Sequence, residues 1–300
     1  MSFSTPRFGR VITAMATPFA DDGSLDLGAS QELARRLVSQ GSDALVVAGT
    51  TGESPVLTDT ERLDLFRAVA EAVEVPMIAG STTNDTAHSV DLSGRVSELG
   101  ASAVLAVTPY YNRPSQEGLR AHFTAIAAAT ELPVLLYDVP HRTGRHIEAD
   151  TVLRLAESVE NVVGLKDAGG DVAATAALAA RAPAGFEIYS GDDALALAQL
   201  AAGAVGVISV ASHWIGNELK ACLEAFVAGE VTRATALNAE LVSSYRFEST
   251  ERWPSPLPTK AVLRAMGLRV GQCRLPMGPA DAELDAAAAS LLESLGRARG

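Results

Sequence analysis

Eight short runs of residues that favour β-strands, most of them apolar, recur along this 300-residue chain and constrain its fold more than any other feature. They lie at residues 11–14, 44–47, 76–79, 103–107, 134–137, 162–166, 187–190 and 205–209. Most intervals between them have room for one helix and two loops. The segments 30–40 and 61–73 carry apolar residues at helical spacing. Near-continuous apolar strands that alternate with helices predict parallel strands buried on both faces.

This pattern predicts an α/β fold, a (β/α)8 TIM barrel with a small C-terminal helical region. The alternative is an open doubly wound sheet, but no G-x-G-x-x-G sequence follows the first run. We expect residues 1–230 to form the barrel, which the first helix after the last strand would close. Residues 231–300 should form the helical region, with a Pro-rich loop at 253–258.

Composition excludes several classes of function. A net charge of −12 argues against a nucleic acid or an anionic membrane as partner. The two cysteines and five histidines show no metal-binding spacing, so we expect no metal. Reduced cysteines and the absence of an apolar leader or membrane-length run predict a cytoplasmic protein.

One of only three lysines stands in an unusual place. Lys220 lies in a mixed polar stretch and Lys260 in the Pro-rich loop, both ordinary positions, whereas Lys166 ends an apolar run. Burying an ammonium group costs free energy. Lys166 is therefore expected either to pair with its neighbour Asp167 or to act as a nucleophilic amine that forms a Schiff base with a ketone.

Polar groups follow several of the other predicted strands. Residues 49–54 offer two hydroxyls and several backbone N–H groups that suit a carboxylate, and residues 108–114 contain adjacent tyrosines. In residues 137–144, Tyr137 could relay protons and Arg142 could bind a carboxylate with two hydrogen bonds. Taken singly, these segments could be ordinary turns, surface tyrosines or a salt-bridged loop. Active sites of such barrels lie at the carboxyl ends of the strands, so their convergence favours a catalytic lysine.

Residues 49–54, 108–114, 137–144 and 164–167 resemble the dihydrodipicolinate synthase family. That family belongs to the pyruvate-dependent class I aldolases, in the superfamily of N-acetylneuraminate lyase. The resemblance runs from about residue 8 to about residue 290, with its motifs in order. It implies condensation of pyruvate with L-aspartate 4-semialdehyde to 4-hydroxy-tetrahydrodipicolinate, in diaminopimelate and lysine biosynthesis. It implies neither a metal nor an organic cofactor.

The resemblance also implies four catalytic residues. Lys166 would form the imine with pyruvate, and Tyr137 would shuttle protons. Thr51 would link Tyr137 to Tyr111 in a hydrogen-bonded relay. Tyr111 would reach into the site of a neighbouring subunit, within a homotetramer built as a dimer of dimers.

Substrate-binding roles follow from the same resemblance. Thr50 and Thr51 would hold the pyruvate carboxylate, and Arg142 would recruit the carboxylate of the aldehyde. Gly191 and Ile208 would shape the pocket through backbone groups.

Two other functions stay open. One is a pyruvate-dependent aldolase acting on a 2-keto-3-deoxy sugar acid or another aldehyde. The other is a non-catalytic protein that binds 2-oxoacids. The continuation of Arg142 into Thr143 and Gly144 favours the synthase over the sugar-acid lyases.

Feedback inhibition by lysine is expected to be weak or absent. The residues that align with the lysine-binding site of inhibited relatives are Ser54, Asp59, Arg62, Asn84, His88 and Tyr110. Arg62 would repel the ammonium group of lysine, and His88 removes an acidic partner.

Overall fold

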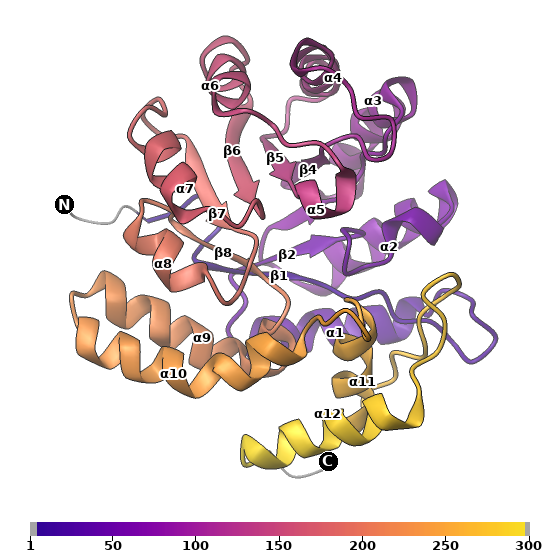
Figure 1. The fold of residues 1–300 in the computed structure, drawn as a ribbon. Coiled ribbons are helices and arrows are strands. Elements are labelled where there is room, and N and C mark those ends of the chain that lie inside the picture. Colours follow the sequence, from indigo (N-terminus) through magenta and orange to yellow (C-terminus); the bar gives the residue numbers. More distant parts are fainter. Residues whose placement is uncertain (1–4, 298–300) are drawn as a thin grey trace.

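Eight parallel strands close into one barrel in the computed structural model, which describes residues 5–297 (Figure 1). The strands are β1 (Val11–Ala14), β2 (Ala44–Val47), β3 (Met77–Ala79), β4 (Ala103–Val107), β5 (Val134–Asp138), β6 (Val162–Asp167), β7 (Glu187–Ser190) and β8 (Gly206–Ser209). Each strand pairs with the next in the chain, and β8 pairs with β1. The predicted (β/α)8 barrel is confirmed, and the open sheet is excluded.

Helices surround the barrel and follow its strands in turn (Figure 1). They are α1 (Leu27–Ser39), α2 (Asp59–Ala72), α3 (Thr86–Arg95), α4 (Gln116–Ala128), α5 (Pro140–Thr143), α6 (Ala149–Ser158), α7 (Val172–Ala179), α8 (Ala196–Ala201) and α9 (Ser212–Val227), with the 3-10 turns η1 (Ser54–Val56) and η2 (Val96–Leu99). A capping box of Thr58 and Glu61 begins α2. None of the helices within residues 5–297 is long and apolar enough to cross a membrane.

The pleat of the strands sorts side chains into two layers. Tyr137 and Tyr189, the register neighbours of Lys166, belong to the apolar cluster inside the barrel. The adjacent Leu136 and Leu165 belong to the cluster between the strands and the helices. Successive strand residues face opposite sides, so Lys166 projects inside the barrel.

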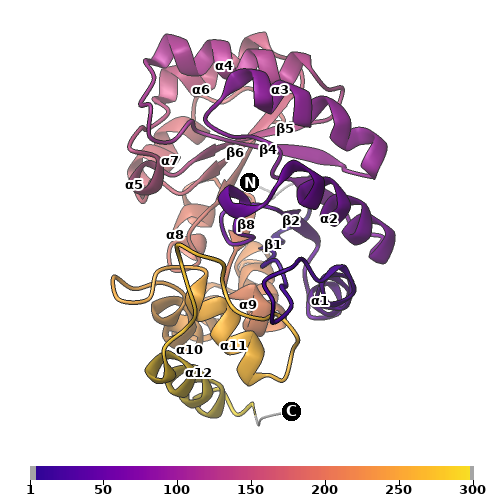
Figure 2. The ribbon, with the colours of Figure 1, turned by 90° about the vertical axis from the view of Figure 1, so that its right-hand side faces the viewer.

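Three further helices pack against one side of the barrel (Figure 2). They are α10 (Val231–Phe247), α11 (Leu257–Ala265) and α12 (Ala282–Ser294). One apolar cluster joins them to the last barrel helices. A buried hydrogen bond adds to this contact, because Trp214 of α9 donates its indole N–H to Ser244 of α10 at 3.0 Å. We propose residues 1–230 as the barrel and 231–300 as the C-terminal helical region, since this boundary separates α9 from α10.

The expectation for Lys260 was wrong. The predicted loop at 253–258 ends early, because Leu257 and Pro258 form the first turn of α11. Proline is tolerated there, since the first N–H groups of a helix have no partner within it. Lys260 therefore lies on a helix, and its side chain is fully buried.

Candidate active site

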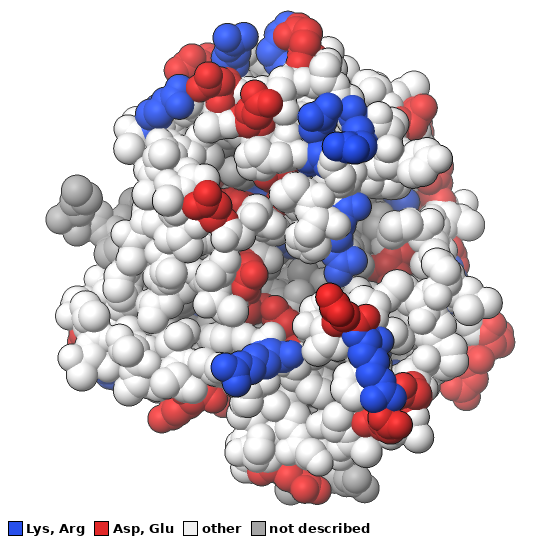
Figure 3. All heavy atoms as spheres, in the orientation of Figure 1, with Lys and Arg blue, Asp and Glu red and all other residues white. Residues whose placement is uncertain are grey.

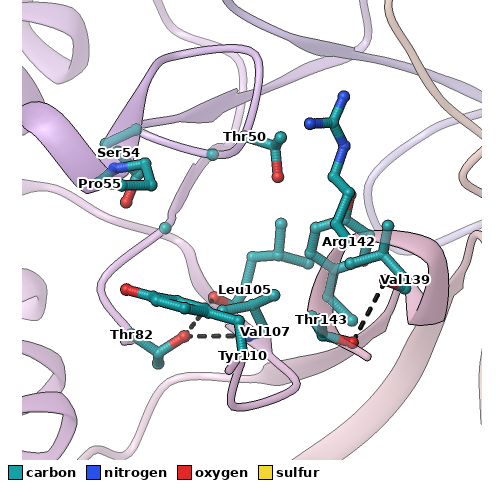
Figure 4. A pocket seen from close by; sticks show the side chains of 14 residues that line it. Thr50, Ser54, Pro55, Thr82, Leu105, Val107, Tyr110, Val139, Arg142 and Thr143 are labelled. Atoms are coloured by element: carbon teal, nitrogen blue, oxygen red, sulfur yellow. Dashed lines mark hydrogen bonds between the residues drawn. The ribbon is translucent and has the colours of Figure 1, made fainter. Parts of the chain in front are cut away.

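A cavity of about 240 Å³ lies at the carboxyl ends of strands β2 to β5. Thr50 lines it after β2, Tyr110 after β4 and Arg142 after β5 (Figure 4). Tyr137 lines it from within β5. On the face viewed in Figure 1 the surface is hollowed, with charged side chains of both signs around the hollow (Figure 3). Several polar segments noted in the sequence thus border one space.

Lys166 stands beside this cavity at the end of β6. The residue is only 5% exposed, and its Nζ lies 4.3 Å from the centroid of the Tyr137 ring. Tyr137 itself lines the cavity. Within residues 5–297, none of the ion pairs involves Lys166. The Tyr137 ring is thus the neighbour of the Lys166 Nζ at this strand end, where no carboxylate in the described part of the chain pairs with it.

Asp167 does not pair with Lys166. It follows Lys166 in the strand and faces the outer helices, where its carboxylate accepts hydrogen bonds from Thr175 Oγ1 at 2.7 Å and Gln199 Nε2 at 3.2 Å. The backbone N–H of Gly169 donates to the same carboxylate at 2.9 Å. Because adjacent strand residues point to opposite faces, the simple strand-end ion pair does not form.

The turn at residues 49–54 bends sharply. Thr50 lines the cavity, while Thr51 is buried. Ala48 and Glu53 have φ angles of 53° and 55°, in the left-handed region that non-glycine residues seldom adopt. This backbone places Gly49 and Thr50 at the wall of the cavity.

Arg142 approaches the cavity from the short helix α5 (Figure 4). Its Nη2 donates to the carbonyl of Ser255 at 3.3 Å. No ion pair within the described part of the chain involves Arg142. A guanidinium group without a carboxylate partner on a cavity wall is suited to an anionic substrate.

Tyr111 points away from its own barrel. It is 91% exposed and has a φ of 75°, while its backbone N–H donates to the carbonyl of Thr143 at 3.3 Å. Within residues 5–297, no hydrogen bond links the hydroxyls of Thr51, Tyr111 and Tyr137. A single chain therefore does not complete the expected relay.

Gly191 and Ile208 lie outside the group of residues that line this cavity. The N–H of Gly191 donates to the carbonyl of Asp167 at 2.7 Å, and a Cβ at this position would come within 2.7 Å of the Ala168 Cβ. Ile208 is a buried member of the cluster inside the barrel. Gly191 thus ties the end of β7 to the end of β6, whereas Ile208 packs in the barrel interior.

Two buried polar residues, His213 and Asp193, hold the backbone near the ends of β1 and β8. The Nε2 of buried His213 accepts the N–H of Ala16 at 3.0 Å, so its Nδ1 carries the proton donated to the carbonyl of Val210 at 2.7 Å. Burial lowers the pKa of His213 to about 4, which keeps the ring neutral. Asp193 accepts the N–H groups of Val210 and Ala211. Sequence spacing carries no signal for such contacts.

The closed barrel and its site define the class of the protein, a (β/α)8 enzyme with its active site at the carboxyl ends of the strands. The model of the dihydrodipicolinate synthetase family matches residues 7–295, and the chain belongs to that family. It is 48% identical over 291 residues to 4-hydroxy-tetrahydrodipicolinate synthase from Moorella thermoacetica, covering 96% of this chain and 99% of the relative.

Solved structures agree with this assignment. A dihydrodipicolinate synthase from Bacillus anthracis superposes with a TM-score of 0.92 at 45% identity, covering 96% of this chain and 99% of that one. The enzyme from Cyanidioschyzon merolae, solved with lysine bound, has a TM-score of 0.93 at 40% identity and covers 99% of both chains.

Proposed function

We propose that this protein condenses pyruvate with L-aspartate 4-semialdehyde to give 4-hydroxy-tetrahydrodipicolinate, through a Schiff base on Lys166. The reaction belongs to diaminopimelate and lysine biosynthesis, which we assign to the cytoplasm. Relatives with nearly the same length carry the name of this synthase.

The observation that carries the proposal is the position of Lys166. Its buried Nζ lies against the Tyr137 ring, beside a cavity that Thr50 lines after β2 and Arg142 after β5. Both substrates carry a carboxylate, and the cavity has two separate sets of groups suited to carboxylates. The turn with Thr50 and Thr51 would take the pyruvate, and Arg142 the semialdehyde.

The first half of the reaction joins pyruvate to the enzyme. The neutral Nζ of Lys166 attacks the ketone carbon, and water leaves as the protonated imine forms. Tyr137 would carry the protons that this addition and dehydration require, because its ring already lies beside the Lys166 Nζ.

The second half forms the carbon–carbon bond. The protonated imine is an electron sink, so the methyl group of bound pyruvate gives up a proton, which Tyr137 would carry, and the imine becomes an enamine. The enamine carbon attacks the aldehyde carbon of the semialdehyde, and the aldehyde oxygen takes up a proton by the same route to become the hydroxyl group of the product. The amino group of the new chain then attacks the imine carbon and displaces Lys166 Nζ, which closes the ring and frees the enzyme.

Trapping the imine tests the proposal. The purified protein is incubated with pyruvate and borohydride, and the adduct is located by peptide mass spectrometry. We expect a reduced pyruvyl adduct on Lys166 and none on Lys220 or Lys260. A folded protein without an adduct would reject the Schiff-base mechanism.

Substitution of Arg142 should separate the two substrates. Arg142→Ala is expected to raise the semialdehyde KM by about 100-fold, because a charged two-pronged contact is lost. The pyruvate KM should change by less than about threefold, since the turn that holds pyruvate is intact. Steady-state kinetics with each substrate varied in turn measures both.

Arg154→Ala is the matched control for this substitution. Arg154 is exposed on α6, away from the cavity, so its removal tests the general effect of losing one positive charge. Unchanged semialdehyde kinetics in Arg142→Ala would refute the role given to Arg142.

A homo-oligomer, built as a dimer of dimers, would complete the site. The proposal is supported by Tyr111, whose side chain is exposed in a single chain and cannot serve its own cavity from there. In the dimer, Tyr111 of one subunit would join Thr51 and Tyr137 of the other.

Lysine is expected to inhibit this enzyme weakly or not at all. Asp59 Oδ2 lies within hydrogen-bond distance of His88 Nε2, at 2.9 Å, and buried Arg62 donates to the carbonyl of Ser54 at 2.7 Å. A cationic guanidinium group near the aligned lysine site would repel the ligand. Initial rates measured against rising lysine should stay nearly constant, and half-inhibition at submillimolar lysine would contradict this expectation.

A further inference from the structure

The turn that borders the cavity after β2 is held in an unfavourable backbone conformation. Ala48 and Glu53, which flank residues 49–52, both have positive φ angles. L-residues pay free energy for this conformation and keep it only where the surrounding structure imposes it. The restraint must therefore come from contacts made by the turn.

Glu53 makes the strongest of these contacts. Its side chain is only 2% exposed, and its Oε1 lies 2.6 Å from the Nζ of Lys260, whose side chain is fully buried. Its Oε2 accepts the backbone N–H of Arg274 at 2.8 Å. Burial lowers the pKa of Lys260, while the Glu53 carboxylate acts in the opposite direction and favours the ammonium form. A buried carboxylate needs such partners to stay charged.

Arg274 restrains the segment that follows the turn. Its Nη1 donates to the carbonyl of Val56 at 2.9 Å, and its guanidinium pairs with Glu61 in the first turn of α2. The Phe19 ring packs against both cations, with Lys260 Nζ at 4.0 Å and the Arg274 guanidinium at 4.2 Å from its centroid. The C-terminal region thus holds the second half of the connection between β2 and α2, from Glu53 to the first turn of α2.

A second lysine ion pair, which does not contact the turn, serves as a comparison. Lys220 of α9 pairs with Asp43 at 2.6 Å, but Asp43 precedes β2, at the opposite end of the barrel from the cavity. Lys220 therefore pairs with a carboxylate before β2, and Lys260 with one after the same strand. Only the Lys260 pair adjoins the substrate-binding turn.

From this geometry we infer that Lys260 is a positioning residue. By pairing with Glu53, it holds Thr50 and Thr51 in the orientation that binds the pyruvate carboxylate. The C-terminal helical region is thereby a part of the catalytic apparatus. The inference rests on the proposed function, because it concerns how the same site binds pyruvate.

The test compares Lys260→Met with Lys220→Met in the full-length protein. We expect Lys260→Met to raise the pyruvate KM about tenfold or more, because Glu53 is left as a buried charge without its cation. The kcat at saturating pyruvate should change by less than about threefold. A loss of folded protein alone would instead lower kcat and leave KM unchanged. Lys220→Met should retain the parental pyruvate KM.

Hydrogen exchange provides a readout that does not depend on activity. Peptides covering residues 47–57 should exchange faster in Lys260→Met than in the parent, because the N–H groups of Glu53 and Ser54 bond within the turn. The same peptides should be unchanged in Lys220→Met. A folded Lys260→Met protein with parental pyruvate KM and parental exchange would overturn the inference.

If Lys260→Met does not fold, the pyruvate KM is measured in Glu53→Gln instead. This substitution keeps the shape of the side chain and removes only its charge, so the pyruvate KM should rise several-fold, and a parental KM would refute the inference. The double variant Glu53→Gln with Lys260→Met should have a pyruvate KM closer to the parent than Lys260→Met, since no charge is left unpaired. Failure of the parent protein to form the imine would instead reject the proposed function.

Discussion

Replacing Lys166 with methionine should lower kcat/KM by roughly 10⁴-fold or more, because the nucleophile that forms the imine is lost. The side chain is buried against Tyr137, and Lys166 makes no ion pair within residues 5–297 whose loss would leave a charge stranded. Methionine fills a similar volume, so the barrel should keep its fold and thermal stability. Kinetics and borohydride trapping on the folded variant measure the effect.

Lys220→Met is the matched control for this result as well. It removes a lysine that pairs with Asp43 at the far end of the barrel, and should retain both activity and the adduct on Lys166. If Lys166→Met kept a tenth of the activity, or if the adduct moved to another lysine, the assignment of the nucleophile would be wrong.

Tyr137→Phe should lower kcat by about 10²- to 10⁴-fold, the range expected for a group that transfers protons in the rate-limiting steps. The phenyl ring would preserve the contact with Lys166 Nζ, so the substitution isolates the hydroxyl. Rapid mixing with pyruvate should also show slower imine formation, because both addition and dehydration need a proton carrier.

Tyr189→Phe is a stringent control, since Tyr189 is the register neighbour of Lys166 on the other side. Its hydroxyl is occupied, donating to Glu187 Oε2 at 2.8 Å and accepting the N–H of Phe8, and burial raises its pKa. We expect some loss of stability but little change in kcat. Equal kcat values for the two variants would remove Tyr137 from the proton path.

The strands were predictable because their signal is local. Each run is short and rich in residues that favour strands, and every predicted strand agrees with the observed one to within one residue at each end. Helical periodicity likewise located α1 and α2. The (β/α)8 barrel then follows from the number and order of the elements, because its connections are all between neighbours in the chain.

The direction of individual side chains was less predictable. The sequence could not decide between a Lys166–Asp167 pair and a free amine, because that choice depends on which face of β6 turns inward. The closed barrel settles it, with Lys166 inside and Asp167 bonded to Thr175 on α7. Because successive side chains of a strand point to opposite faces, the Lys166–Asp167 pair and the free Lys166 amine exclude each other.

By itself, the sequence determined the barrel, the end at which polar segments gather, and the unusual position of Lys166, since all three depend on residues close together in the chain. Only the tertiary structure decided that Lys260 is buried and paired with Glu53, or that Arg274 bonds to Glu53 across 221 residues. No periodicity links such distant positions. Their pairing depends on how the C-terminal helices pack against the finished barrel.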